Sequence, residues 1–415
     1  MHAAARLCAL LLALACALAA PAARAAGPDA TRTALEREMR SAGTSSGAYA
    51  IDLESGLELA AIRPDGERTP ASVEKLYTTS TALLRFGPEG RLATSALGAA
   101  AVGPGGVLAG DLYVRGGGDP TFGPGQAGAL AATLVRQTGL RAVTGRVIGD
   151  ESAFDTLRGP PSSGFETSRY VGPLGALTFN RGRESGKRPG FQARPARFAA
   201  AAFRRALERA GVDVAAGAAA GATPPAAVTL AEQPSPPMAE LARRTNVPSD
   251  NFLAETLLKA LGMRYGGAGS TRAGAQVVRS SVVGLGLTPT VVDGSGLSRA
   301  NHTSPRQVVR LLQRMGEEDT FPAFQRSLAV AGVSGTLRRR MRGTPAQRRC
   351  RGKTGTLTGV SALAGYCTTT SGSRVAFAFL MNRVSATGAR RLQDRMTVAL
   401  ARYGPAAGAA APRDR

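Results

Sequence analysis

The 415-residue chain contains no tryptophan, only two histidines and four cysteines. His2 lies at the very N-terminus, which leaves His302 as the one histidine further along the chain. A zinc site built from several imidazoles therefore cannot form. A Ser-His-Asp triad would depend on His302, whose polar surroundings do not favour that role. No Gly-rich phosphate loop ending in Lys-Ser or Lys-Thr is present, so we expect neither a metal nor another cofactor.

Lysine is almost as scarce as histidine in this sequence. Lys and Arg together number 52, yet only four positions are lysine: Lys75, Lys187, Lys259 and Lys353. Arginine cannot lose its proton in a protein, whereas a buried lysine shifts its pKa readily and can act as a base. The few lysines are therefore candidates for roles that arginine cannot perform, and Lys75 and Lys353 both lie in short catalytic-type motifs.

The formal net charge is +23. An excess of this size predicts acidic surroundings such as a polyanionic wall, membrane head groups or nucleic acid. A genome that favours arginine codons is the alternative explanation. The arginines are scattered rather than clustered, which argues against a nucleic-acid groove, so we expect no nucleic-acid partner.

Residues 1–25 resemble a secretory signal peptide. Arg6 supplies the positive start, residues 7–18 form a short apolar run, and residues 23–25 (Ala-Arg-Ala) offer a cleavage site. A lipoprotein site at Cys16 is the weaker alternative. The protein is therefore expected to be exported to the periplasm, with peripheral association with a membrane as a further possibility.

Ser72 and Lys75 form a Ser-x-x-Lys motif at the start of a predicted helix. Pro70 suits the first turn of a helix, and the apolar residues that follow recur at helical spacing to about residue 86. Side chains three apart share one face, so a hydroxyl and an amine become neighbours at the positive end of the helix. The motif is short, and by itself it more often marks a cap beside a solvated lysine.

Two further motifs follow in the chain. Ser249-Asp250-Asn251 precedes a helical stretch, where Ser-Asp alone is an ordinary cap. Lys353-Thr354-Gly355-Thr356 lies on a predicted strand, and Gly355 allows a close approach of another backbone or a ligand. Each motif is weak alone, but together and in this order they are specific.

Cys350 and Cys367 flank the Lys353 segment. A hairpin of residues 348–356 and 361–369 would place them opposite each other, and an exported protein permits a disulfide. We therefore predict a bridge bracing this strand, with two reduced, buried cysteines as the alternative.

The three motifs, in this order, resemble those of the penicillin-recognising serine enzymes. Residues 110–121, 292–301 and 353–366 further resemble the D-alanyl-D-alanine carboxypeptidase/endopeptidase family that includes penicillin-binding protein 4. The likeness extends over nearly the whole chain after residue 25. Two departures are the absence of tryptophan and an insertion that is short for a family that usually carries two extra domains.

The resemblance implies acyl transfer on peptidoglycan stem peptides, with β-lactams as covalent inhibitors. Ser72 would be the nucleophile and Lys75 its base, while Ser249 relays a proton and Asn251 holds the substrate amide. The terminal carboxylate would bind at Lys353, Thr354 and Thr356, beside Gly355. Backbone N–H groups of Ser72 and Thr356 would form the oxyanion hole. Arg299 would recognise an acidic group of the stem peptide; the alternatives are a surface arginine and a structural ion pair.

Two other functions remain open from the sequence. One is a β-lactamase-like hydrolase, although no further general base for fast deacylation is evident. The other is a non-catalytic basic protein that binds the wall or senses β-lactams on the same fold.

The expected fold is α/β, with a penicillin-binding transpeptidase-like (serine β-lactamase-like) domain. Its antiparallel five-stranded sheet, covered by helices, would comprise residues 26–90 and 240–403. Residues 91–239 would form a strand-rich insertion of one or two domains, and residues 404–415 a disordered tail. Helices are expected at 30–42, 72–86, 127–137, 195–210, 236–262, 270–281, 304–316, 321–330 and 386–402. Strands are expected at 47–53, 57–62, 107–115, 142–148, 177–180, 227–230, 350–356, 361–369 and 373–382.

Overall fold

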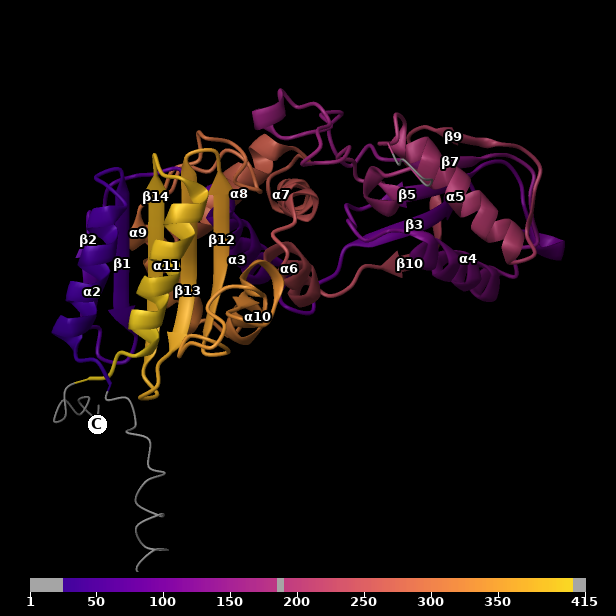
Figure 1. The fold of residues 1–415 in the computed structure, drawn as a ribbon. Helices are drawn as coiled ribbons and strands as arrows, with labels where there is room; N and C mark the ends of the chain where they lie inside the picture. The colour runs from indigo at the N-terminus through magenta and orange to yellow at the C-terminus, as the bar shows by residue number, and fades with distance from the viewer. Residues whose placement is uncertain (1–24, 185–189, 406–415) are drawn as a thin grey trace, which may run out of the picture.

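The computed structural model describes residues 25–184 and 190–405. The predicted signal peptide therefore lies outside the described residues, apart from its last position, and so does most of the predicted tail. Figure 1 shows two bodies joined by a narrower region, with both ends of the described chain in the same body. Among the described residues, no helix is both long and apolar enough to cross a bilayer.

The larger body is built on an antiparallel sheet in the order β11-β12-β13-β14-β1-β2. Five of its strands were expected, and a sixth is added because two residues pair with the free edge of β12. The strands are β1 (Ser46–Asp52), β2 (Glu58–Ile62), β11 (Ala329–Val330), β12 (Cys350–Leu357), β13 (Val360–Thr368) and β14 (Arg374–Asn382).

Helices cover both faces of this sheet, because successive side chains of a strand point to opposite faces. On β1, Ala48 and Ala50 join one apolar cluster, under α2 (Pro28–Ser41) and α11 (Ala386–Ala401). Tyr49 and Ile51 point to the other face and join a second cluster. That cluster also contains side chains of α3 (Lys75–Phe86), α6 (Met238–Asn246), α7 (Asn251–Tyr265), α8 (Thr271–Val283), α9 (Pro305–Glu317) and α10 (Phe321–Arg326).

The smaller body lies between α3 and α6 in the chain. Its main sheet has the order β10-β3-β5-β7-β9, and a second sheet pairs three two-residue strands as β4-β6-β8. Side chains of both sheets, α4 (Pro124–Thr138) and α5 (Pro195–Arg209) belong to one apolar cluster. The strands are β3 (Ala93–Gly98), β4 (Val107–Leu108), β5 (Leu112–Gly116), β6 (Ala142–Val143), β7 (Val147–Asp150), β8 (Asp213–Val214), β9 (Ala218–Ala220) and β10 (Val228–Pro234).

The strand expected at residues 177–180 is absent. A 3₁₀ turn, η4 (Phe179–Gly182), occupies the end of this range. Asn180 and Arg181 adopt φ values of 50° and 59°, in the left-handed region that a strand cannot include. The prediction was wrong because the apolar run before this point lines a buried loop instead of pairing with a neighbour.

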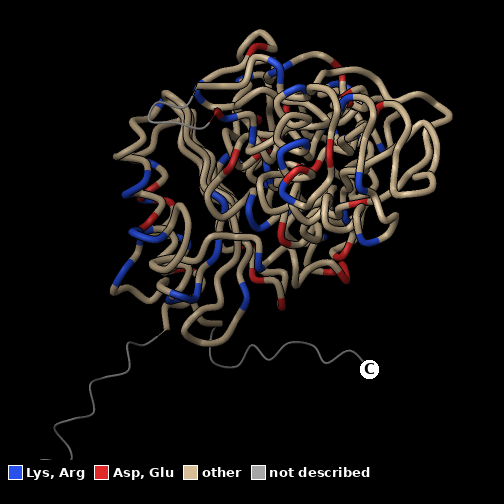
Figure 2. The backbone as a smooth tube through the Cα atoms, turned by 90° about the vertical axis from the view of Figure 1, so that its right-hand side faces the viewer, with Lys and Arg blue, Asp and Glu red and all other residues tan. Residues whose placement is uncertain are grey.

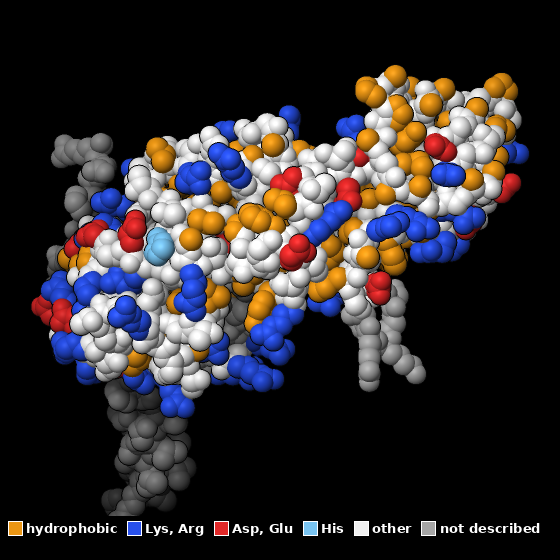
Figure 3. Space-filling model, turned by 90° about the horizontal axis from the view of Figure 1, so that it is seen from above, with side chains coloured by type: hydrophobic (Ala, Val, Ile, Leu, Met, Phe, Trp, Pro, Cys, Tyr) orange, Lys and Arg blue, Asp and Glu red, His pale blue; other side chains and the backbone are white. Residues whose placement is uncertain are grey.

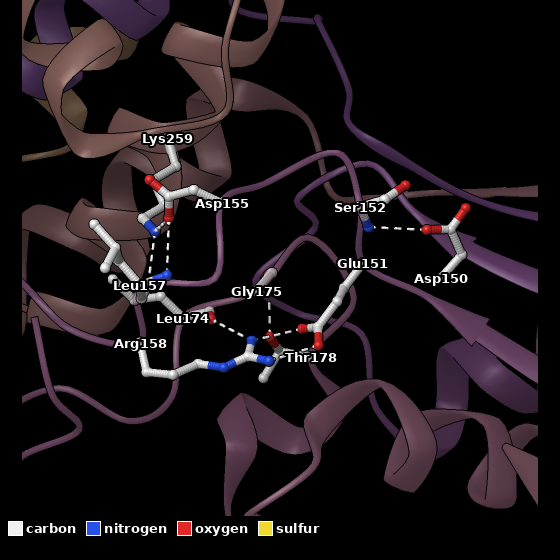
Figure 4. A network of polar contacts seen from close by, with 10 residues as sticks. All are labelled: Asp150, Glu151, Ser152, Asp155, Leu157, Arg158, Leu174, Gly175, Thr178 and Lys259. Carbon is white, nitrogen blue, oxygen red and sulfur yellow. Dashed lines mark hydrogen bonds and ion pairs between the residues drawn. The ribbon is translucent and has the colours of Figure 1, made fainter. Parts of the chain in front are cut away.

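A long loop from the smaller body reaches back over α7. Figure 4 shows how two ion pairs anchor it. The buried ammonium of Lys259 on α7 contacts Asp155 Oδ1 at 2.5 Å and the carbonyl oxygen of Leu157 at 2.7 Å. Arg158 bonds both carboxylate oxygens of Glu151 at 2.6 Å. The Lys259 contacts fix the loop to the middle of α7. Further along the loop, Tyr170 contacts Asn251 at the start of α7, where the second sequence motif lies.

Lys and Arg occur along the backbone of the whole molecule, with acidic residues interspersed (Figure 2). This distribution agrees with the scattering seen in the sequence.

Candidate active site

Ser72 and Lys75 lie at the junction of a 3₁₀ turn and a helix. The turn η1 (Ala71–Glu74) runs directly into α3, so the expected single helix begins with a tighter turn. Residues three apart eclipse each other in 3₁₀ geometry. As a result, Lys75 Nζ lies 3.0 Å from Ser72 Oγ. The hydroxyl and the amine are thus in direct hydrogen-bond contact.

The Lys75 ammonium is fully buried and has two other acceptors. It donates to Asn251 Oδ1 at 2.8 Å and to the Ser295 carbonyl oxygen at 2.5 Å. Burial lowers the pKa of Lys75 to about 8, because a charged amine loses hydration there, while the Asp293 and Glu255 carboxylates oppose the shift. The amine is therefore able to exchange a proton near neutral pH.

Three buried carboxyl groups surround this lysine, and sequence analysis missed all of them. Glu74, Glu255 and Asp293 are completely buried, and burial raises the pKa of each, that of Glu255 to about 8. Backbone N–H groups of Gly294 and Ser295 donate to Glu255, and those of Gly296 and Ser298 donate to Asp293. Neither carboxyl oxygen of Glu74 has a hydrogen-bond partner among the described residues. The Asp-Gly-Ser-Gly stretch that begins at Asp293 was a visible signal, whereas nothing in the sequence pointed to Glu74.

The second and third motifs meet through a second buried lysine. Lys353 Nζ on β12 donates to Ser249 Oγ at 2.7 Å and to the Thr354 carbonyl oxygen at 2.8 Å. Burial, with repulsion from Lys75, holds the pKa of Lys353 well below its usual value. Ser249 has a φ of 64°, a strained conformation for this residue and one that often marks a functional site.

All three motifs open into one cleft of about 920 Å³. Its lining includes Ser72, Ser249 and Asn251 together with Thr354 and Thr356. Lys75 and Lys353, two of the predicted site residues, lie beneath the cleft surface, where their side chains are fully buried. Their ammonium groups contact the hydroxyl groups of Ser72 and Ser249, which line the cleft.

Gly355 sets how closely β12 approaches the turn that carries Ser72. A Cβ added at Gly355 would lie 2.6 Å from the Pro70 carbonyl oxygen and 3.1 Å from the Ser72 nitrogen. A side chain here would therefore push apart the two backbone segments predicted to supply the oxyanion hole.

Arginines line one part of the cleft. The expected Arg299 is exposed and donates to the carbonyl oxygen of Thr358 at 2.5 Å, which fixes it at the rim. Arg339, Arg340 and Arg390 also line the cleft, and Arg390 donates to Thr356 Oγ1 at 3.3 Å. Sequence analysis did not single out these three, because nothing distinguishes them from the many other arginines.

The smaller body also contributes to the cleft wall, which the sequence did not reveal. Ser162, Ser163, Ser168 and Tyr170 line the cleft from the loop that Lys259 anchors. The carbonyl oxygen of Tyr170 accepts a long hydrogen bond of 3.4 Å from Asn251 Nδ2. These residues are far from the motifs in sequence, and only the folded loop brings them there.

Cys350 and Cys367 occupy opposite positions of β12 and β13. The structure joins them in a disulfide with a Cα–Cα distance of 4.0 Å. The bond lies three residues before Lys353, at the far end of the strand from the cleft.

The comparison with protein families agrees with this geometry. The D-Ala-D-Ala carboxypeptidase 3 (S13) family model matches residues 32–187 and 191–403. The chain belongs to this family. It is therefore a serine-type D-Ala-D-Ala carboxypeptidase, which confirms the family resemblance, the function class and the enzyme class predicted from the three motifs.

Curated relatives cover most of the chain. A D-alanyl-D-alanine carboxypeptidase of Actinomadura sp. (strain R39) is 31% identical over 87% of this chain and 82% of its own length. Carboxypeptidase DacB of Mycolicibacterium smegmatis is 29% identical over 81% of this chain and 76% of its own length.

Solved structures share the fold. Penicillin-binding protein 4 (dacB) of Haemophilus influenzae aligns with a TM-score of 0.76 and 21% identity, over 89% of this chain and 99% of that one. A penicillin G-acylated predatory endopeptidase of Bdellovibrio bacteriovorus aligns with a TM-score of 0.53 and 17% identity, over 88% and 94%. The predicted fold class is confirmed.

Proposed function

We propose that this carboxypeptidase cleaves the terminal D-Ala-D-Ala bond of peptidoglycan stem peptides through an acyl-enzyme on Ser72. The observation that carries the proposal is the 3.0 Å contact between Lys75 Nζ and Ser72 Oγ, in a cleft also lined by Ser249, Asn251 and Thr354. A serine hydroxyl is a weak nucleophile until an adjacent base accepts its proton.

In the first step, Ser72 Oγ attacks the carbonyl carbon of the penultimate D-Ala while the uncharged Lys75 amine takes the hydroxyl proton. The backbone N–H groups of Ser72 and Thr356 stabilise the resulting oxyanion, each donor typically contributing about 3 kcal/mol in the transition state. The C–N bond then breaks as a proton reaches the leaving amine through Ser249. Water hydrolyses the ester that remains.

Substrate binding in this scheme uses the polar groups around the nucleophile. Asn251, held by Lys75 through its Oδ1 at 2.8 Å, would donate its Nδ2 to the substrate amide carbonyl. Lys353, whose charged form a bound carboxylate would favour, and the hydroxyl groups of Thr354 and Thr356 would bind the terminal carboxylate. Arg299 at the rim would meet an acidic group further along the stem peptide.

The test is labelling by a fluorescent penicillin, combined with mass analysis of D-Ala released from a pentapeptide. Wild-type protein should be labelled covalently and release D-Ala, and Ser72→Ala should do neither while keeping its melting temperature. Persistent labelling of Ser72→Ala would remove Ser72 as the nucleophile. A short-lived penicilloyl-enzyme would favour a β-lactamase, and wall binding without D-Ala release would favour a sensing protein.

We also propose that the mature enzyme is exported to the periplasm after cleavage near residue 25. Residues 26–90 and 240–403 would then form the catalytic domain, and residues 91–239 one inserted module, as the single apolar cluster shared by its two sheets supports. N-terminal sequencing of the protein recovered from the periplasm tests the cleavage site.

Association with an anionic wall or membrane surface is a further part of the proposal. Residues 320–393 contain no Asp or Glu, and ten arginines in this stretch are exposed. Five of them lie between residues 338 and 349: Arg338, Arg339, Arg342, Arg348 and Arg349. In Figure 3, Lys and Arg side chains form several groups on one face of the molecule. Binding to anionic wall polymer or anionic vesicles should weaken as salt rises. An Arg338→Gln/Arg348→Gln/Arg349→Gln variant should bind less, and unchanged binding would refute this surface.

A further inference from the structure

The second catalytic motif is held from outside its own domain. Three consecutive residues, Asp250, Asn251 and Phe252, each contact the smaller body. Arg181 forms an ion pair with Asp250 Oδ2, and its guanidinium lies 5.6 Å from the centre of the Phe252 ring. The Tyr170 carbonyl contacts Asn251. The motif is therefore linked to the inserted module at successive positions.

Asp250 serves two partners with its two carboxylate oxygens. Oδ1 accepts from the Leu253 nitrogen at 3.0 Å and so caps α7, while Oδ2 faces Arg181. On either side of Asp250, Ser249 Oγ and Asn251 Oδ1 accept hydrogen bonds from the two buried lysines. A shift of Asp250 would therefore move both catalytic partners at once.

Hydrogen bonds hold the backbone turn that carries Arg181. It lies in η4, where two successive residues other than glycine have positive φ values. The buried Gln192 side chain donates to the carbonyl oxygens of Phe179 and Arg183 at 3.0 and 2.8 Å, and the Asn180 nitrogen donates to the Phe122 carbonyl at 2.8 Å. Strained backbone of this kind persists where the surroundings over-determine it. The turn is thus a fixed support for the guanidinium.

The two bodies are not packed continuously at this junction. A hollow of about 560 Å³ remains, lined from one side by Asn180 and Arg181 and from the other by Val247 and Asp250. The Arg181 side chain is 46% exposed and that of Asp250 is 12% exposed. An ion pair so accessible to water contributes little to global stability. We expect the ion pair between Arg181 and Asp250 to affect the local geometry of the turn that contains Asp250 instead.

We propose that Arg181 is a positioning residue, through which the inserted module holds the Ser249–Asn251 turn in its reactive geometry by pairing with Asp250. The proposal rests on the roles of Ser249 and Asn251 proposed above. It assigns the inserted module a direct part in catalysis, because acylation then depends on a contact made by a residue outside the catalytic domain.

The experiment compares variants of the full chain. Arg181→Met removes the pair, Asp250→Asn removes the charge but keeps an oxygen to cap α7, and the double variant removes both. Arg204→Met is the matched control, because Arg204 pairs with Glu208 on α5 of the same module at comparable exposure. Each variant is measured for penicillin acylation rate, kcat and KM on a D-Ala-D-Ala peptide, and melting temperature.

We expect Arg181→Met to lower the acylation rate and kcat by about 10- to 100-fold, the size that small misplacements of catalytic groups produce. KM should change little, and the melting temperature should match that of Arg204→Met. Asp250→Asn should show the same loss, and the double variant should be no worse than either single change, since both disrupt one interaction. Arg181→Lys, which keeps the charge, should recover part of the rate.

The positioning role would be overturned if Arg181→Met were acylated at the wild-type rate. It would also be overturned if the rate losses of Arg181→Met and Asp250→Asn added independently in the double variant, or if the loss of rate accompanied a fall in melting temperature. These outcomes leave Ser72 acylation of the wild-type enzyme intact. Failure of the wild-type enzyme itself to be labelled would instead overturn the proposed function.

Discussion

At the scale of a single residue, two opposing effects set the pKa of Lys75. Burial disfavours its charged form, and the nearby carboxyl groups favour it, which together leave its pKa at about 8. Arginine in this position would remain charged at every accessible pH. The need for an amine that can release and accept a proton therefore explains why position 75 is a lysine in a chain that otherwise uses arginine.

Replacing Lys75 by Arg should lower the acylation rate by about 10²- to 10⁴-fold, the usual contribution of a general base. The charge is kept, but guanidinium cannot accept the Ser72 proton. Stopped-flow measurement of penicillin acylation tests this. A wild-type rate in Lys75→Arg would show that Lys75 is not the base.

The acylation rate of the wild-type enzyme should rise with pH through about 8 and then level off. Below the pKa the Lys75 amine already holds its proton and cannot take another from Ser72, so activity is lost as pH falls. The rate is measured from about pH 6 to pH 10, with melting temperatures recorded at each pH as a control. A rate that stays flat across this interval, or that falls with rising pH, would contradict the assignment.

At the scale of elements, the site depends on how closely β12 lies against η1. The 2.6 Å between a Cβ added at Gly355 and the Pro70 carbonyl oxygen leaves no room for a methyl group. Because β12 is paired with β13 along its length, it cannot move locally without disturbing that register. The backbone donors of the proposed oxyanion hole are thus positioned by the sheet.

Gly355→Ala should therefore reduce acylation by about 10- to 100-fold, because it displaces β12 from Ser72. Gly128→Ala on α4 is the control, since an added methyl group there meets nothing within 4 Å. Acylation rates and melting temperatures of both variants are compared. Equal acylation by the two variants would show that the close approach at Gly355 has no catalytic importance.

At the scale of the whole molecule, the smaller body reaches the active site through a loop anchored by Lys259. The Lys259 side chain is fully buried, whereas Asp155, its partner, is 30% exposed. Loss of the ammonium would leave the Leu157 carbonyl without its present donor. The same loop carries Tyr170 to the cleft wall, so stability and substrate contact are linked there.

Lys259→Met, which keeps much of the side-chain volume, should lower the free energy of unfolding by about 1–3 kcal/mol, the usual cost of an unmade buried hydrogen bond. It should impair hydrolysis of a stem peptide more than acylation by penicillin, because the smaller ligand needs less of the loop wall. Urea denaturation and the two rates test this, with Arg136→Met as control, because the Arg136 side chain is exposed on the surface of α4. Unchanged stability together with unchanged peptide hydrolysis would refute the anchoring role.

Much of the larger body was predictable from local pattern. The helix starting at residue 386 and the strands from residue 350 to 382 lie within two residues of their expected limits, because their apolar periodicity and turn residues are strong. The insertion was harder. β3, β8 and β9 were missed. β8 and β9 have only two or three residues, which carry too little pattern to recognise. β3 (Ala-Thr-Ser-Ala-Leu-Gly) consists mostly of small residues of low strand propensity.

The sequence by itself determined the chemistry on offer: a serine three residues before a lysine, two more motifs in a diagnostic order, and too few histidines for a rival mechanism. Local spacing was enough to bring Ser72 and Lys75 together, since residues three apart lie one helical turn from each other. Only the tertiary structure decided that Asn251 would meet Lys75, that Ser249 would meet Lys353, and that three carboxyl groups would be buried around the amine. The two hydrogen bonds join residues 176 and 104 positions apart. Which distant groups share a cleft follows from how sheet, helices and inserted loop pack, not from any local rule.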